Sequence, residues 1–126
     1  MSNPLALIIE DDPKLCNTFQ TIMNTVEFET EIALDGLQAQ TRLQELVPDL
    51  IILDLHLPYI SGLELLAQIQ ADTRLTQAHI VILTADIYKA KDLAVGLEHV
   101  LVKPVGFYRL RDLAANIREK IVSSTI

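Results

Sequence analysis

A chain of 126 residues is the length of one domain, and an apolar content of half excludes an intrinsically disordered chain. The net charge of −7 argues against nucleic acid as a direct partner, because phosphate binding needs clustered Lys and Arg. The single cysteine, Cys16, excludes an intramolecular disulfide and fits a reducing, cytoplasmic compartment. No apolar run approaches the roughly 20 residues that span a bilayer, so no membrane contact is expected.

Strand and helix signals alternate along the first third of the chain. Leu5 to Ile9 is a continuous apolar run, typical of a strand buried on both faces. Asp12 followed by Pro13 predicts a helix that begins with an N-cap and a proline in its first turn. Beyond this helix we expect a more polar strand over 29–34 and an amphipathic helix over 37–46.

The same alternation continues to the end of the chain. Asp49 to Leu55 holds the strongest signal for a buried strand, and Ser61 is expected to cap the next helix. The remaining predicted elements are a strand over 79–83, a short helix over 87–95, a strand over 100–102, a helix over 107–122 and frayed residues at 123–126. Five strands alternating with five helices predict one α/β domain over 1–126, with a parallel sheet covered on both faces and a core over about 5–122.

Polar residues follow four of the predicted strands. Open parallel sheets bind ligands beyond the carboxyl ends of their strands, so these residues should meet at one rim. Carboxylates gathered there repel one another, which raises their pKa values, and a bound Mg²⁺ ion would offset the repulsion. One carboxylate can then act as a nucleophile toward a phosphoryl group. The rim residues are Glu10, Asp11, Asp12, Asp54, Thr84 and Lys103.

The residues around these strand ends form four short motifs. In order, they are Ile8-Ile9-Glu10-Asp11-Asp12-Pro13, Leu53-Asp54-Leu55-His56-Leu57-Pro58, Leu83-Thr84-Ala85 and Val102-Lys103-Pro104. Together, over residues 5 to about 120, they resemble the receiver domains of response regulators from two-component systems. The resemblance implies a flavodoxin-like three-layer sandwich with the strand order 2-1-3-4-5.

The resemblance also implies a role for each matching residue. Asp54 corresponds to the phospho-accepting aspartate, and Thr84 and Lys103 correspond to the groups that contact the phosphoryl group. Mg²⁺ is expected to be held by Glu10, Asp11, Asp54 and the backbone carbonyl of His56. The Lys103-Pro104 bond is expected to be cis. His56 and Asp86 stand where the family tunes dephosphorylation, and the Asp86 carboxylate can position water or repel the phosphoryl group.

A receiver domain is a signalling module that assists its own phosphorylation and dephosphorylation and turns over no metabolite. The resemblance therefore implies a sensor histidine kinase or phosphotransfer protein as the phosphoryl donor. It also implies a downstream protein target or effector domain, and a homodimer would fit the family. No effector domain follows Val122 in the sequence, so the domain acts through protein contacts or belongs to a longer chain.

Two departures from the family pattern concern the output. Val100 stands where the family usually has Tyr or Phe, and a valine cannot make the aromatic rotamer switch. The stretch from Thr84 to Lys103 is about three residues shorter than usual, close to one helical turn. The fourth helix should therefore be short or irregular, and we expect the signal to leave through another surface or a changed geometry.

Two alternative functions compete with the phospho-accepting module. One is a degenerate receiver that serves as a phosphorylation-independent binding platform, which Val100 keeps open. The other is a phosphatase of the haloacid dehalogenase type. That class needs a second Asp two residues after the nucleophile, where this chain has His56, and usually a cap domain.

Overall fold

The computed structural model describes residues 3–124 and holds one five-stranded parallel sheet. The strand order is β2-β1-β3-β4-β5, as the resemblance implied. The strands are β1 (Leu5–Ile9), β2 (Glu29–Ala33), β3 (Leu50–Asp54), β4 (His79–Thr84) and β5 (His99–Val102). Asp54 pairs with Leu83, and Thr84 pairs with Val102, so the carboxyl ends of β3, β4 and β5 lie level with one another.

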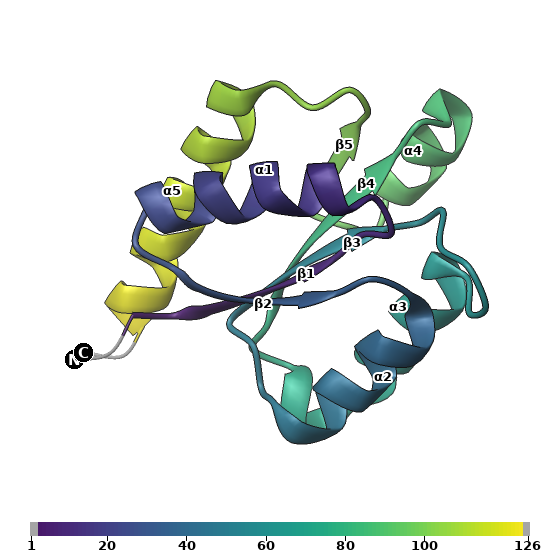
Figure 1. Cartoon of the computed structure of the whole chain (residues 1–126), viewed down its shortest axis with the longest axis horizontal. Coiled ribbons are helices and arrows are strands. Elements are labelled where there is room, and N and C mark those ends of the chain that lie inside the picture. The colour runs from purple at the N-terminus through teal and green to yellow at the C-terminus, as the bar shows by residue number, and fades with distance from the viewer. Residues whose placement is uncertain (1–2, 125–126) are drawn as a thin grey trace.

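The helices alternate with the strands and cover both faces of the sheet. They are α1 (Pro13–Thr25), α2 (Gly36–Glu45), α3 (Gly62–Ala71), α4 (Ile87–Ala94) and α5 (Phe107–Ser124), with a 3-10 turn η1 (Thr73–Leu75). Figure 1 shows α1 and α5 on one side of the sheet and α2 and α3 on the other. The predicted three-layer α/β sandwich is therefore confirmed.

The two faces of the sheet bury separate sets of apolar side chains. Ala6 and Ile8 of β1 point toward α1 and α5, whereas Leu7 and Ile9 point toward α2 and α3. All five residues of β3 are buried, which explains why this segment is a continuous apolar run. Among the described residues, no helix is long and apolar enough to cross a membrane.

Some element boundaries differ from the predicted ones. β2 ends at Ala33, one residue before the predicted end, and η1 was not predicted at all. The closing helix continues to Ser124, so the expected fraying does not begin at Ser123, and residues 125–126 lie outside the described part of the chain. α4 is short, as predicted: it has eight residues, of which only Ala90 is buried.

The first four helices begin soon after a strand ends, and a side chain caps each of them. The carboxylates of Asp12, Asp35 and Asp86 and the hydroxyl of Ser61 accept hydrogen bonds from backbone N–H groups in the first turns. Such caps satisfy donors that have no partner inside the helix. They therefore fix the direction in which the chain leaves the carboxyl rim of the sheet.

Gly62 brings the start of α3 against the end of β3. A Cβ atom at this position would lie 2.4 Å from Leu55 Cα and 2.7 Å from the Asp54 carbonyl oxygen. Gly62→Ala should therefore destabilise the fold by about 1–3 kcal/mol, because backbone must move to admit the methyl group. Gly96→Ala is the matched control, since a Cβ there meets nothing within 4 Å. Urea unfolding that shows the two variants to be equally stable would contradict this account of the junction.

Candidate functional site

Three carboxylates meet at the carboxyl rim of the sheet. One oxygen from each of Glu10, Asp11 and Asp54 lies within 4.8 Å of the others. Glu10 follows β1 and is 1% exposed, and Asp54 ends β3 and is 2% exposed, whereas Asp11 is open to solvent. These three of the predicted rim residues therefore lie together. The carboxylates of Glu10 and Asp54 are buried, and that of Asp11 is in contact with solvent.

Lys103 joins the two buried carboxylates. Its Nζ lies 2.8 Å from Glu10 Oε1 and 3.1 Å from Asp54 Oδ2. The lysine reaches them from the segment after β5, where the Lys103-Pro104 peptide bond is cis, as the resemblance implied. Burial lowers the pKa of Lys103, but its hydrogen bonds to Glu10 and Asp54 outweigh this and raise the pKa above its ordinary value. The site therefore holds a firmly protonated ammonium group.

Each buried carboxylate has a second partner in the backbone. The other Glu10 oxygen, Oε2, accepts a hydrogen bond from Asp12 N at 3.3 Å. The other Asp54 oxygen, Oδ1, accepts from His56 N at 3.0 Å. A carboxylate oxygen has two lone pairs, so each oxygen keeps the capacity for one more contact. His56 itself is exposed, and its side chain is not needed for this arrangement.

Burial raises the pKa of Glu10 from 4.5 to about 7. The nearby Asp54 and Asp11 carboxylates add to this rise, and the hydrogen bond from Lys103 opposes it. The sequence predicted a raised pKa from repulsion between carboxylates. For Glu10 the direction is confirmed, but loss of solvent is the largest cause. Near neutral pH, Glu10 is therefore close to its midpoint of ionisation.

The donor set suits a hard divalent cation. Glu10, Asp11 and Asp54 supply only carboxylate oxygens, which Mg²⁺ prefers, and in its octahedral shell adjacent oxygens lie about 3 Å apart and opposite ones about 4 Å apart. With all three ionised, Lys103 offsets one charge of three, so two negative charges remain for a dication to neutralise. Mg²⁺ is therefore a chemically fitting occupant, and these three residues are the ones that would hold it.

Thr84 completes the predicted set. It is the last residue of β4 and is 5% exposed, and its carbonyl oxygen accepts a hydrogen bond from Lys103 N at 2.8 Å. Its hydroxyl oxygen accepts one from Asp86 N at 3.1 Å. The Asp86 carboxylate caps α4, where it accepts from Tyr88 N and Lys89 N. Thr84 is thus tied through its backbone to Lys103 and through its hydroxyl to the start of α4.

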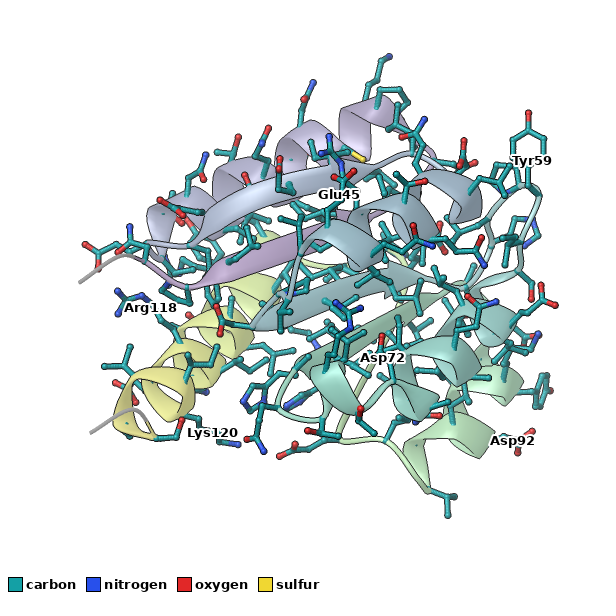
Figure 2. The ribbon with its side chains drawn as sticks, turned by 90° about the horizontal axis from the view of Figure 1, so that it is seen from below. Glu45, Tyr59, Asp72, Asp92, Arg118 and Lys120 are labelled. Carbon is teal, nitrogen blue, oxygen red and sulfur yellow. The ribbon has the colours of Figure 1, made fainter. Side chains whose placement is uncertain are left out.

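The structure also places two residues outside this cluster, Tyr59 and Val100. Tyr59, in the loop after β3, is 80% exposed, has a left-handed backbone with φ 70°, and projects into solvent (Figure 2). Val100, where an aromatic residue was expected, is partly buried against the core on the α2 and α3 face. The exposure of Tyr59 in this loop agrees with its interpretation from the sequence, whereas no sequence pattern signals its positive φ.

This fold and this site have known counterparts. The response regulator receiver domain family matches residues 6–115 of the chain. The chain therefore belongs to the response regulator receiver domain family, whose members are signalling modules of two-component systems.

Particular relatives are similar over part of their length. The DNA-binding response regulator MtrA of Mycolicibacterium smegmatis is 37% identical over 92 residues, which are 73% of this chain and 39% of that protein. The phosphate regulon transcriptional regulatory protein PhoB of Rhizobium meliloti is 34% identical over 98 residues, which are 75% of this chain and 43% of that protein. The chain thus spans about two fifths of the length of these relatives.

Solved structures show the same fold over nearly the whole chain. The chemotaxis response regulator CheY4 of Vibrio cholerae superposes with a TM-score of 0.82 at 24% identity, covering 92% of this chain and 99% of that one. A signal receiver domain from Vibrio parahaemolyticus gives a TM-score of 0.83 at 25% identity, covering 98% of this chain and 95% of that one.

Proposed function

We propose that this chain is the phospho-accepting receiver module of a two-component phosphorelay, with Asp54 as the acceptor in a Mg²⁺-dependent reaction. The observation that carries the proposal is the pair of contacts from Lys103 to the buried Glu10 and Asp54, beside the third carboxylate of Asp11. A receiver that only binds partners, without phosphorylation, needs no such cluster. Apolar side chains of similar volume at these positions would make the fold at least as stable.

The proposed reaction is a phosphoryl transfer that the chain itself assists. A carboxylate oxygen of Asp54 attacks the phosphorus of a phosphohistidine, an O–P bond forms as the P–N bond breaks, and the departing imidazole takes the electron pair. Lys103 offsets the charge on the phosphoryl oxygens, and the Thr84 hydroxyl donates to one of them. Mg²⁺, held by Glu10, Asp11, Asp54 and the backbone carbonyl of His56, would neutralise further negative charge.

The proposed partners follow from this chemistry. A sensor histidine kinase or a phosphotransfer protein supplies the phosphoryl group, and water removes it again at the same site. The signal then passes to a downstream protein target or to an effector domain, and a homodimer is one form that this output can take. The net charge of −7 disfavours direct contact with nucleic acid, and the single cysteine fits action in the cytoplasm.

Phosphorylation by a small donor tests this proposal. The protein, incubated with Mg²⁺ and acetyl phosphate and weighed intact, should gain one phosphoryl group, whereas Asp54→Asn should gain none. Asp92→Asn is the matched control, because Asp92 lies on α4 with its side chain in solvent, and it should behave as the unaltered protein (Figure 2). Absence of an adduct with every donor tried would instead favour the phosphorylation-independent platform.

A further inference from the structure

We propose that Asp86 is a positioning residue for phosphoryl transfer, which holds the Thr84 hydroxyl so that it donates to the incoming phosphoryl group. This inference rests on the proposed function, because it concerns how that reaction is assisted. Asp86 lies two residues beyond Thr84, is exposed, and would act through its neighbour rather than through contact with the reacting atoms.

The Thr84 hydroxyl has a hydrogen that is free to donate. A hydroxyl has one hydrogen to donate and two lone pairs that accept. Asp86 N–H occupies one lone pair at 3.1 Å, and among residues 3–124 this is the only hydrogen bond that the hydroxyl makes. The hydroxyl hydrogen must therefore point away from Asp86 N. Thr84 is only 5% exposed and no residue among 3–124 accepts this hydrogen, so it remains available for an acceptor that arrives at the rim.

The Asp86 carboxylate holds the backbone nitrogen of Asp86 in place. Asp86 Oδ1 accepts hydrogen bonds from Tyr88 N at 3.0 Å and Lys89 N at 3.1 Å. These two bonds close the turn between β4 and α4 and fix the peptide unit whose N–H contacts Thr84. Few side chains of α4 pack against the core: Ala90 is its only buried residue, and Leu93 is partly buried there. The cap therefore sets the position of the turn as well as the start of the helix.

Capping of α4 and negative charge are two distinct ways in which the Asp86 carboxylate can act. The sequence left open that the Asp86 carboxylate positions water or repels the phosphoryl group. In the structure both cap bonds converge on one oxygen of that carboxylate, which directs the side chain toward the first turn of α4. An amide or hydroxyl side chain can make the same cap without the charge. Charge and capping therefore predict different results for neutral substitutions.

The experiment is a double-mutant cycle on the rate at which acetyl phosphate phosphorylates the full chain at saturating Mg²⁺. Thr84→Ala and Asp86→Ala should each slow the reaction by about tenfold, the effect of losing one hydrogen bond. Asp86→Ala should have no further effect in the Thr84→Ala background, because it acts through that hydroxyl. Equal slowing in both backgrounds would overturn the proposal.

Neutral caps supply the second arm. Asp86→Asn and Asp86→Ser should keep the unaltered rate, and faster phosphorylation in both would show a role of charge and overturn the proposal. Asp35→Ala removes the cap of α2, where Asp35 Oδ1 accepts from Gln38 N at 2.7 Å, and should leave the rate unchanged. If Asp35→Ala slows phosphorylation as much as Asp86→Ala does, the slowing comes from the loss of any helix cap, and the proposal is overturned. If the unaltered protein takes up no phosphoryl group, that result contradicts the proposed function itself, before any variant is compared.

Discussion

Lys103→Met should slow phosphorylation of Asp54 by acetyl phosphate about 10²-fold or more, because the proposed transfer then lacks the positive charge that offsets the phosphoryl oxygens. The same change leaves the buried carboxylates of Glu10 and Asp54 without their shared cation. We therefore also expect lower stability, with a larger loss at about pH 8 than at about pH 5, where protons can replace the ammonium group. Timed intact-mass spectra and urea unfolding at both pH values measure the two effects.

Lys120→Met is the matched control for this change. Lys120 lies on α5, is 56% exposed in its side chain, and pairs with the exposed Glu98 at 3.4 Å. Exposed pairs of this kind contribute about 0–1 kcal/mol, so the control should alter neither rate nor stability appreciably. Phosphorylation of Lys103→Met at the unaltered rate would show that the lysine is structural and takes no part in the transfer.

The metal-free protein should become less stable as the pH rises from about 5 to about 8. Glu10 keeps its proton in the folded protein up to a pKa of about 7, whereas the unfolded chain releases it near 4.5. The stabilisation from this proton is complete below pH 4.5 and is lost as the pH rises through 7. In full it amounts to about 3 kcal/mol. Unfolding measured across this pH range in the presence of a chelator gives the slope.

Saturating Mg²⁺ should reduce this loss, because the ion stabilises the ionised form of Glu10 and binds more tightly as the proton leaves. Glu10→Gln supplies the control, since a neutral amide of nearly the same size has no proton to lose in this range. Its stability should change less with pH than that of the unaltered protein. Equal slopes in the two proteins would mean that Glu10 is ionised throughout and that its environment is more polar than its burial implies.

Residues close in sequence to a strand end were predictable. The apolar runs of β1 and β3 stop at charged residues, and parallel strands place all such stops at one rim, so Glu10, Asp11 and Asp54 could be grouped without coordinates. Caps such as Asp12 and Ser61 were predictable for the same reason, because the capping side chain and its partner are two or three residues apart.

Individual hydrogen bonds between different elements were not predictable from the sequence. The Cys16 thiol donates to the Glu10 carbonyl oxygen at 3.1 Å, and burial raises the pKa of this cysteine to about 11. Arg74 reaches 2.6 Å from the Leu43 carbonyl oxygen, which helps to explain why η1 forms where no periodic pattern marks it. Both contacts depend on how helices pack against the sheet, and local propensity carries no information about that packing.

Mapping the modified residue tests the central claim most directly. After incubation with acetyl phosphate and Mg²⁺, borohydride reduction converts an aspartyl phosphate to homoserine, and peptide mass spectrometry then locates it. We expect homoserine at position 54 alone, and none when a chelator replaces Mg²⁺. Homoserine at position 11 or 12, or the same yield at position 54 with the chelator present, would contradict the account.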